Sequence, residues 1–385
     1  MNTQHRYRAA IIGHTGLGNY GHGLDTCFSG LAQIDVVAVA DPDPEGREAA
    51  RIRSGAVSAY ADYQQMLDRE RPDIVAIAPR LVDERIAMIT AAVTAGCHLY
   101  VEKPLVATLA DADVVLTLCE RAGVRIAVAH QNRLHPVTLH IQQLVAEGRI
   151  GRLRQIRGYG KMDHRGGGQD LAVLGPHILD LMRLFAGDAH WCSADLLVGA
   201  RLADISDVRQ GDEGIGPVLG DGLRANYGFD HGVIGSFESY HDLGDGTTVF
   251  GIDLVGEQGQ LALRGSFTKR LFFYPYPYPE PGLRADHWEQ VPVPTAGSDE
   301  QLSENPPDAS VQHLLSQSAN QRLVLDLIAA IEEGREPASS GQRARCALEL
   351  IQAVAAAHAA GGRVSLPLAE RTHPYAAAAI TAVNP

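Results

Sequence analysis

A lysine between an acidic residue and a proline is the first candidate for chemistry in this sequence. Glu102, Lys103 and Pro104 follow the apolar run CHLYV (97–101), so we expect them to lie where a buried strand ends. Ligands bind outside the carboxyl ends of strands in open α/β sheets. In such a crevice, partial desolvation lowers the pKa of a lysine, and its ammonium group can donate a hydrogen bond to a substrate oxygen. An isolated tripeptide of this kind is more typical of an exposed Glu-Lys pair in a loop.

A glycine-rich stretch near the start of the chain is the second candidate. The sequence GHTGLGNYGHGLD (13–25) holds five glycines within eleven positions and follows the apolar run RAAII (8–12). Glycine adopts a positive φ at little cost, so Gly13 is suited to the turn at the strand end. We expect a helix to begin near residues 18–19 and to run through Phe28, with its N-terminal N–H groups facing an anion.

This stretch has the spacing of a dinucleotide-binding loop, with G-x-G-x-x-G at Gly16, Gly18 and Gly21. We expect Gly21 and Gly23 to be packing glycines, where the helix approaches the sheet. The alternative is a turn that only packs a strand against a helix. If the loop binds a dinucleotide, the turn and the backbone next to the phosphates comprise Gly13, His14, Thr15, Gly16, Leu17, Gly18 and Asn19.

An aspartate ends the second apolar run and supports the same interpretation. Asp41 follows DVVAVA (35–40) and lies 25 positions after Gly16, near the spacing expected for the acidic residue of such a site. A carboxylate there accepts hydrogen bonds from the ribose hydroxyls of NAD and repels the 2′-phosphate of NADP. The sequence therefore predicts NAD as the cofactor, with NADP less favoured.

Size and charge limit the class of protein. The chain of 385 residues is suited to two domains, and with 45% hydrophobic and 21% charged residues it predicts a packed, soluble protein. The formal charge of −13 argues against nucleic acid or an anionic membrane surface as the main partner. No apolar run approaches the roughly 18 residues of a membrane helix, and we expect no secretory signal before the first strand.

The cysteines and histidines predict neither disulfides nor a metal. The five cysteines are dispersed, with no C-x-x-C pair, which favours reduced, buried thiols and a cytoplasmic location. The sixteen histidines form no metal-binding motif such as H-E-x-x-H, so we expect no metal.

Two regions with different patterns must position these residues. Up to about residue 131, five short β-branched runs alternate with helical segments, which predicts a doubly wound Rossmann domain with a parallel sheet (1–131). The remainder (132–385) predicts a second α/β domain, used for substrate binding and oligomerisation, with an open, mostly antiparallel sheet. The expected helices there are 137–147, 169–186, 320–333 and 342–360. The proline-rich stretch 272–281 predicts an edge or extended segment, and 295–310 a polar loop.

The ordered series of motifs resembles the Gfo/Idh/MocA family, the glucose–fructose oxidoreductase and inositol dehydrogenase group. The series is the glycine loop, VAVADPDP, DIVAIAP, AGCHLYVEKPL, VAHQNRLHP and GGGQDLAVLGPHILDLMRLFAG, and the resemblance spans nearly the whole chain. It implies a nicotinamide dinucleotide, with Pro79 and Glu102 beside it, and a carbohydrate-type substrate. It also implies that Lys103 contacts the reacting oxygen and the nicotinamide region.

His177, in LGPHILDL, matches the histidine that serves as general base in the dehydrogenases of this family. Oxidation of a secondary alcohol needs a base for the hydroxyl proton while hydride leaves to the nicotinamide, and imidazole has a suitable pKa. A lone helical histidine is otherwise more often structural. Asp180, three residues later, could orient the histidine or anchor the helix.

The sequence departs from the family pattern upstream of this histidine. The aspartate often found four residues earlier is replaced by Val173, and the nearest acid is Asp170, which either caps the helix or contacts substrate. Seven residues return a helix to nearly the same face, so Asp170 would share a face with His177. After DIVAIAP stand Arg80 and Asp83, and we expect Arg80 to be a surface residue unless it reaches the pyrophosphate.

A polar segment before the same helix is the candidate substrate-binding loop. Asp163, His164 and Arg165 can bind sugar hydroxyls or a carboxylate, and a solvated loop is the alternative.

These observations predict an NAD(H)-dependent oxidoreductase that acts on a secondary hydroxyl of a sugar, polyol or derivative, in a homodimer or homotetramer. One alternative is an NAD-dependent glycoside-cleaving enzyme that oxidises its substrate transiently, with no net redox change. Another is a non-catalytic regulator that senses a dinucleotide on the same fold.

Overall fold

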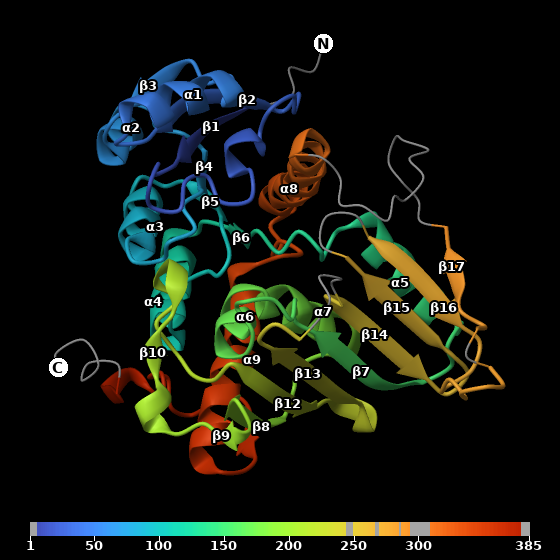
Figure 1. Ribbon diagram of the computed structural model, residues 1–385. Coiled ribbons are helices and arrows are strands. Elements are labelled where there is room, and N and C mark those ends of the chain that lie inside the picture. Colours follow the sequence, from blue (N-terminus) through green and yellow to red (C-terminus); the bar gives the residue numbers. More distant parts are fainter. Residues whose placement is uncertain (1–5, 244–248, 266–268, 285, 293–308, 379–385) are drawn as a thin grey trace. The chain divides into compact units, whose positions relative to one another are not determined.

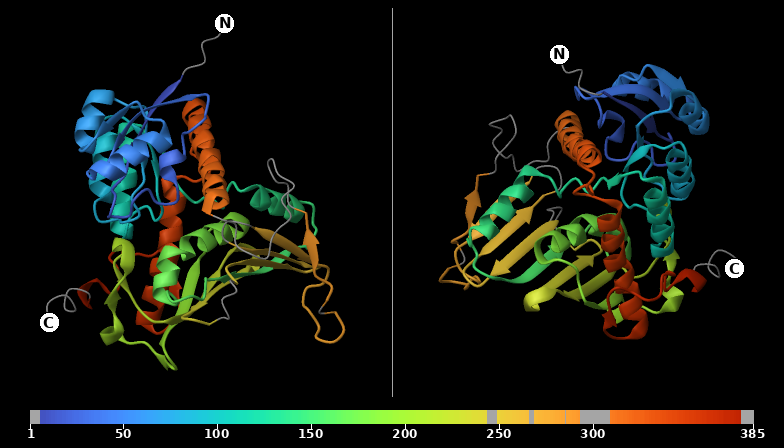
Figure 2. Two further views of the ribbon diagram at one scale, coloured as in Figure 1. Left: turned by 45° about the horizontal axis from the view of Figure 1, so that its top comes forward. Right: turned by 180° about the vertical axis from the view of Figure 1, so that it is seen from behind.

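The computed structural model describes residues 6–243, 249–265, 269–284, 286–292 and 309–378 (Figures 1 and 2). It divides into two compact units. Unit 1 comprises Met1–Gln131, Glu213–Ile215 and Ala309–Arg345, and unit 2 comprises the rest. The division at residue 131 expected from the sequence stays a prediction. In the structure, segments 213–215 and 309–345 pack with unit 1.

Unit 1 contains a six-stranded parallel sheet in the order β3-β2-β1-β4-β5-β6, as predicted for a Rossmann-type domain. Most of its side chains are buried, because helices cover both faces of such a sheet. Its strands are β1 (Tyr7–Ile12), β2 (Ile34–Ala40), β3 (Ser58–Tyr60), β4 (Ile74–Ile77), β5 (His98–Val101) and β6 (Ile126–Val128).

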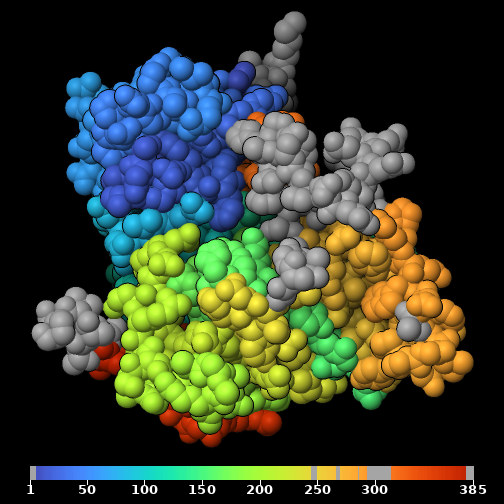
Figure 3. All heavy atoms as spheres, viewed as in Figure 1, coloured from blue at the N-terminus to red at the C-terminus, as the bar shows by residue number. Residues whose placement is uncertain are grey.

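The helices between these strands begin and end where capping residues allow. Asp43 accepts the Gly46 N–H to begin α1, Thr108 caps α4, and Gly55 and Gly123 end these helices with positive φ. The outward faces of α1 and α2 are exposed, in the blue region of Figure 3. The helices are α1 (Pro44–Ser54), α2 (Tyr63–Glu70), α3 (Arg85–Thr94) and α4 (Leu109–Ala122).

The prediction of a helix that begins near residues 18–19 and runs through Phe28 is wrong. Residues 13–30 form a series of turns, with one 3-10 turn, η1 (Leu24–Thr26). Gly16, Gly18, Asn19, Gly21 and Gly23 all have positive φ, a left-handed conformation that an α-helix does not accommodate.

A helix from late in the chain completes unit 1. Helix α8 (Ala309–Glu333) packs against η1 and β6. The segment after it continues this contact, because Val128 donates its N–H to the Ser339 carbonyl at 2.8 Å and the Ser339 hydroxyl donates to the Val128 carbonyl at 2.6 Å. The expected helix 320–333 is thus the second half of a longer one, and the expected loop 295–310 lies largely outside the described residues.

Unit 2 is built on a mixed, mostly antiparallel sheet in the order β17-β16-β15-β14-β7-β13-β12-β8-β18, with β9 paired to β8. The β7–β13 pair is parallel and the others are antiparallel, so the predicted fold class is confirmed. The strands are β7 (Leu153–Tyr159), β8 (Trp191–Val198), β9 (Arg201–Leu202), β12 (Gly222–Gly228), β13 (Ile234–Tyr240), β14 (Gly251–Gly256), β15 (Gln260–Arg264), β16 (Arg270–Tyr274), β17 (Glu289–Val291) and β18 (Val364–Ser365).

Helix α7 packs closely on this sheet. A Cβ on Gly158 of β7 would lie 2.4 Å from Ile178 and 2.6 Å from Met182, so glycine lets the helix approach. The expected helix 169–186 is broken at Leu174 into α6 (Gly168–Val173) and α7 (Gly175–Ala186). The other helices are α5 (Pro136–Ala146) and α9 (Gly341–Ala360), whose first five residues belong to unit 1.

Two smaller features complete the description. A hairpin of β10 (Arg209–Gln210) and β11 (Pro217–Val218) carries residues 213–215 at its tip. The first three residues of the proline-rich stretch, 272–274, lie in β16, which pairs on both sides, so they are not in an edge strand. Residues 275–281, which hold the prolines, follow this strand. Within the described residues no helix is long and apolar enough to cross a membrane.

Candidate functional site

Lys103 lies at the carboxyl end of β5 and is buried, with 1% of its surface exposed. Burial lowers the pKa of the Lys103 ammonium group from its ordinary value, because the charged form loses hydration. The carboxylates of Glu102 and Glu213 oppose this shift, and the guanidinium groups of Arg80 and Arg85 reinforce it. The lysine is therefore held in a desolvated, charged environment, and its role in ligand binding stays a prediction.

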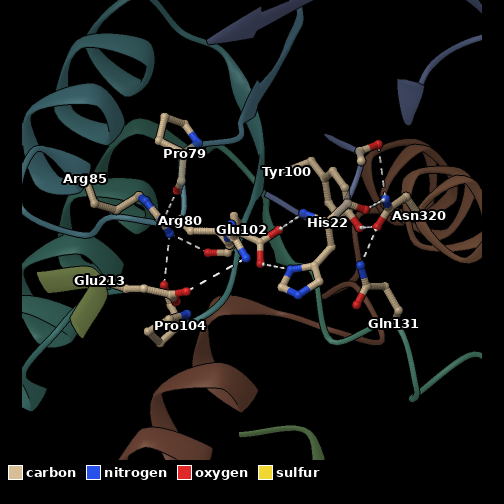
Figure 4. Close-up of polar contacts among 11 residues, drawn as sticks. His22, Pro79, Arg80, Arg85, Tyr100, Glu102, Pro104, Gln131, Glu213 and Asn320 are labelled. Carbon is tan, nitrogen blue, oxygen red and sulfur yellow. Dashed lines mark hydrogen bonds and ion pairs between the residues drawn. The ribbon is translucent and has the colours of Figure 1, made fainter. Parts of the chain in front are cut away.

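Glu102 is fully buried and is held by His22 from the glycine-rich stretch (Figure 4). The His22 Nδ1 lies 2.7 Å from Glu102 Oε1, and the His22 backbone N–H donates to Oε2 at 3.2 Å. Burial by itself raises the pKa of Glu102, but the charge and hydrogen bonds of His22, together with Lys103, outweigh it and hold the pKa at about 2. The contact fixes the loop after β1 to the loop after β5.

Arg85, the first residue of α3, joins two loops at the same edge of the sheet. Its guanidinium group is fully buried and donates to the backbone carbonyls of Pro79, Glu102 and Pro104, the last at 2.9 Å (Figure 4). Burial lowers its pKa to about 10. Glu102 and Pro104 stand on either side of Lys103, so Arg85 fixes the backbone around the lysine. Its contact with Pro79 joins this loop to the loop after β4.

The glycine turn after β1 shares some features with a dinucleotide-binding loop: two of its glycines allow close packing, and its tip is exposed. A Cβ on Gly13 would overlap the Tyr20 ring, at 2.1 Å, and a Cβ on Gly18 would lie 2.4 Å from the Arg80 backbone nitrogen. A Cβ on Gly16, by contrast, would meet nothing within 4 Å, and Leu17 and Gly16 are exposed. The tip of the turn is open at the carboxyl edge of β1 and β4, where a pyrophosphate binds in this fold.

Asp41 lies at the end of β2, but its carboxylate faces the protein interior. It is fully buried and accepts the Thr15 backbone N–H at 3.0 Å and the Thr15 and Tyr20 hydroxyls at 2.7 Å each. The Asp43 N–H donates to its other oxygen at 2.9 Å. Asp41 therefore anchors the glycine turn. The residues fit a dinucleotide at the turn and beside Lys103, whereas the ribose role of Asp41 stays a prediction.

The other predicted loop residues are placed as follows. His14 is partly exposed, pairs with Asn19 in an isolated bridge and has its ring nitrogen 3.2 Å from the Thr15 carbonyl. The Asn19 side chain accepts the Gly16 N–H at 3.1 Å. These contacts are internal to the turn, which supports loop packing as the role of His14.

Asn320 of α8 is a site-forming residue that the sequence analysis did not identify. Its fully buried amide accepts the Tyr100 hydroxyl at 2.7 Å and the Gln131 amide at 3.0 Å, and donates to the His22 carbonyl at 3.0 Å (Figure 4). It thus supports the His22 contact with Glu102 from behind. No local signal marks it, because Asn320 is separated from these partners by nearly 200 residues or more.

Arg80 and Glu213 form an ion pair that the sequence analysis did not identify. The Arg80 Nη1 lies 3.9 Å from Glu213 Oε1 (Figure 4), and the Arg80 N–H donates to the Gly18 carbonyl at 3.2 Å. Glu213 comes from the hairpin tip, so a residue far along the chain contributes a carboxylate to the site in unit 1.

The predicted residues of unit 2 lie around α6 and α7. His177 is buried in the first turn of α7, and Asp180 forms a buried ion pair with Arg133, at 2.8 Å, that anchors this helix. Asp170 is fully buried in α6, where Oδ2 accepts the Lys161 N–H at 2.8 Å and the Ser239 hydroxyl at 2.6 Å. Because the helix breaks at Leu174, the expected shared face of Asp170 and His177 does not exist.

The candidate substrate-binding loop is partly exposed. Asp163 accepts the Arg165 N–H and Nε–H at 3.0 Å each, and hydrogen bonds from Arg165 hold the pKa of Asp163 at about 2. His164 is exposed. Among the described residues, no group of three or more His, Cys, Asp or Glu side chains is placed to hold a metal ion. The thiols of Cys27, Cys97, Cys119 and Cys192 are free and buried.

The sheet order and the glycine turn define unit 1 as a Rossmann-type domain. Residues 7–130 match the model of a family described as "Oxidoreductase family, NAD-binding Rossmann fold", the Gfo/Idh/MocA family. This match confirms, for the N-terminal domain, the resemblance noted in the sequence.

Two curated relatives are sugar dehydrogenases by name. The D-apiose dehydrogenase of Paraburkholderia graminis is 30% identical over 200 residues, 48% of this chain and 51% of that protein. The D-xylose 1-dehydrogenase (NADP(+)) 2 of Haloferax volcanii is 30% identical over 132 residues, 34% of this chain and 40% of that protein. The chain spans about half or less of the length of the curated relatives it matches.

Solved structures share the fold across both units. Levoglucosan dehydrogenase in complex with NADH and levoglucosan is 19% identical with a TM-score of 0.70, covering 94% of this chain and 100% of that one. An oxidoreductase from Agrobacterium radiobacter in complex with NAD+, L-tartaric acid and magnesium is 18% identical with a TM-score of 0.70, covering 94% and 98%. At these identities the likeness establishes the fold.

Proposed function

We propose that this protein is an NAD(P)-dependent dehydrogenase that oxidises a secondary hydroxyl of a sugar, polyol or derivative, or reduces the corresponding ketone. The observation that carries the proposal is the buried Lys103, whose neighbour Glu102 is joined to the glycine turn through His22. The sugar dehydrogenases among the relatives support the substrate class.

In this proposal Lys103 binds the reacting oxygen. Its ammonium group donates a hydrogen bond to the hydroxyl and stabilises the negative charge that develops on this oxygen as its proton departs. Arg85 and Glu102 hold the lysine backbone in place, because they fix the loops on either side of it. His177 accepts the hydroxyl proton. The bound nicotinamide supplies the hydride acceptor.

We propose NAD as the preferred cofactor. Asp41, Asp43 and Glu45 lie within five residues at the end of β2 and the start of α1, and Asp43 and Glu45 are at least partly exposed. Their negative charge disfavours the 2′-phosphate of NADP, whether or not Asp41 contacts the ribose directly. Because one relative is named as an NADP(+)-dependent D-xylose dehydrogenase, the preference between NAD and NADP must be measured. A homodimer or homotetramer stays a prediction.

The experiment that tests the function has two steps. Calorimetric titration of the cofactor-stripped protein with NAD+ and with NADP+ measures binding, and a panel of sugars and polyols read at the absorbance of reduced nicotinamide measures turnover. Lys103→Met and His177→Ala should each remove most turnover while the dinucleotide still binds. Binding without turnover across the panel would favour a sensor, and substrate cleavage without added NAD+ would favour the transient-oxidation alternative.

A further inference from the structure

The glycine turn lacks the element that usually holds a pyrophosphate in a dinucleotide-binding fold. In such folds the turn opens into a helix, whose N-terminal N–H groups and dipole attract the phosphates. Here residues 13–30 form turns with one 3-10 turn of three residues, η1. The stretch 13–25 also contains no lysine or arginine. A pyrophosphate at this turn therefore needs positive charge from another segment of the chain.

Arg80, in the loop after β4, is in direct contact with the glycine turn. Its backbone N–H donates to the Gly18 carbonyl at 3.2 Å. A Cβ on Gly18 would lie 2.4 Å from the Arg80 nitrogen and 3.0 Å from its Cα, so a side chain at this position would collide with the backbone of the loop. Glycine thus lets the loop lie against the turn, and the side chain of Arg80 starts at the turn itself.

The guanidinium group of Arg80 has unused hydrogen-bonding capacity. Its Nε is buried and has no hydrogen-bond partner among the described residues. Its Nη1 lies 3.9 Å from Glu213 Oε1, an ion pair that is longer than a hydrogen bond, and the side chain is 40% exposed (Figure 4). A buried donor without an acceptor is unfavourable, so an anion that accepts from this group would stabilise the arrangement.

Two other cations at this edge of the sheet are placed differently. Arg85 is fully buried, and its guanidinium group already donates to three backbone carbonyls. Lys103 is 1% exposed and binds the reacting oxygen in the proposed function. Arg80, by contrast, combines contact with the turn, partial exposure and an unused donor.

We propose that the Arg80 guanidinium group binds the pyrophosphate of the dinucleotide and supplies the positive charge that a helix N-terminus would otherwise provide. Guanidinium has five N–H donors in a planar fork, and it binds phosphate through two parallel N–H···O hydrogen bonds. This inference rests on the proposed function, since it requires a dinucleotide at the turn. Arg80 takes no part in proton or hydride transfer.

Calorimetric titration of the cofactor-stripped full chain with NAD+ and with ADP-ribose tests this role. ADP-ribose carries the same pyrophosphate without the nicotinamide. Arg80→Met should weaken binding of both by about 10- to 100-fold, as expected for the loss of charge-assisted hydrogen bonds. Arg80→Lys should fall between the two, because it keeps the charge without the planar fork. Added KCl should weaken NAD+ binding more steeply in the wild type than in Arg80→Met, since salt screens the attraction to the phosphates.

Two control variants separate cofactor binding from a structural role. Arg121→Met removes an exposed arginine from the last turn of α4 and should leave both affinities unchanged. Glu213→Gln breaks the same ion pair from its other side. It should bind NAD+ at least as tightly as the wild type, because it removes a charge that repels the phosphates. If Glu213→Gln also weakens NAD+ binding, the ion pair is a structural link and the inference is overturned.

Wild-type NAD+ affinity in Arg80→Met, in protein that unfolds at the wild-type urea concentration, would equally overturn the inference. If Arg80→Met is less stable, Arg80→Lys is compared with Arg80→Gln, and equal affinity in these two variants has the same meaning.

The affinity of the wild type separates this inference from the proposed function. If the wild type and Arg80→Met bind NAD+ equally well, the function stands and Arg80 has no such role. If the wild type binds NAD+ but turns over no substrate, the function fails and the affinities still decide the role of Arg80. A wild type that binds neither NAD+ nor NADP+ would refute both.

Discussion

Thr15 donates both its backbone N–H and its hydroxyl to the carboxylate of Asp41, at 3.0 and 2.7 Å. This contact joins the tip of the glycine turn to the end of β2, and the Tyr20 hydroxyl extends it to the far side of the turn. The aspartate that the sequence marks as a ribose ligand is therefore also the residue that shapes the turn.

Asp41→Ala should reduce the free energy of unfolding by about 1–3 kcal/mol, because it leaves the buried hydroxyl of Tyr20 and the partly buried donors of Thr15 and Asp43 unsatisfied. It should weaken binding of NAD+ and NADP+ together, since the turn loses its shape. Urea unfolding and calorimetry measure the two effects. A narrowed NAD+/NADP+ preference with unchanged stability would instead indicate that Asp41 acts on the cofactor and not on the shape of the turn.

Glu102 should make stability depend on pH in the acid range. Its pKa is about 2 in the folded protein and 4.5 ordinarily, so its contribution is complete above about pH 4.5 and is lost as the pH falls toward 2. The shift corresponds to about 3 kcal/mol. Urea unfolding between pH 3 and 7 should show that Glu102→Gln lacks this part of the wild-type dependence, and equal pH dependence in the two proteins would contradict the assignment.

Arg85→Met should destabilise the protein by about 2–4 kcal/mol, because three buried carbonyl groups lose their donor. Since these carbonyls flank Lys103, kcat should fall by more than NAD+ affinity does. Chemical denaturation and steady-state kinetics measure these effects. Arg53→Met, which removes an arginine that is partly exposed and paired with Asp25, is the control for loss of a guanidinium group.

Lys103 should produce an alkaline limb in the pH–rate profile below the ordinary lysine value of 10.5, because burial lowers its pKa. Loss of the proton removes the hydrogen bond to the substrate oxygen, so the rate falls as the pH rises. Lys103→Arg should retain some activity and lose this limb, since guanidinium stays protonated throughout. A limb that persists unchanged in Lys103→Arg belongs to another group.

The sequence predicts most strands of unit 1 because a buried parallel strand needs a short run of apolar residues. All five runs in the first third correspond to strands, and Glu102 and Lys103 lie at the edge where the runs place them. The prediction of a helix after Gly13 is wrong because it relied on the G-x-G-x-x-G pattern, which usually precedes a helix. The closely spaced glycines were themselves a signal against it, since each favours a turn rather than a helix.

Glu213 and Asn320 could not be found in this way. Glu213 stands in a polar turn, DEG, like many surface turns, and Asn320 stands in an ordinary helical sequence. Their roles come from the packing of segments that are far apart in the chain, and sequence periodicity describes only local structure. The roles of Lys103 and His177 stay predictions until they are measured.

The late arrival of α8 has a consequence for biosynthesis. The sheet of unit 1 is encoded before residue 131, but Asn320 and Ser339, which hold its glycine turn and β6, are translated about 190 or more residues later. At ordinary translation rates of about 5–20 residues per second, the interval between synthesis of the sheet and synthesis of α8 is on the order of ten seconds or more. During this time the surface that α8 later covers is open to chaperones, and the cofactor domain cannot close before most strands of unit 2 have left the ribosome.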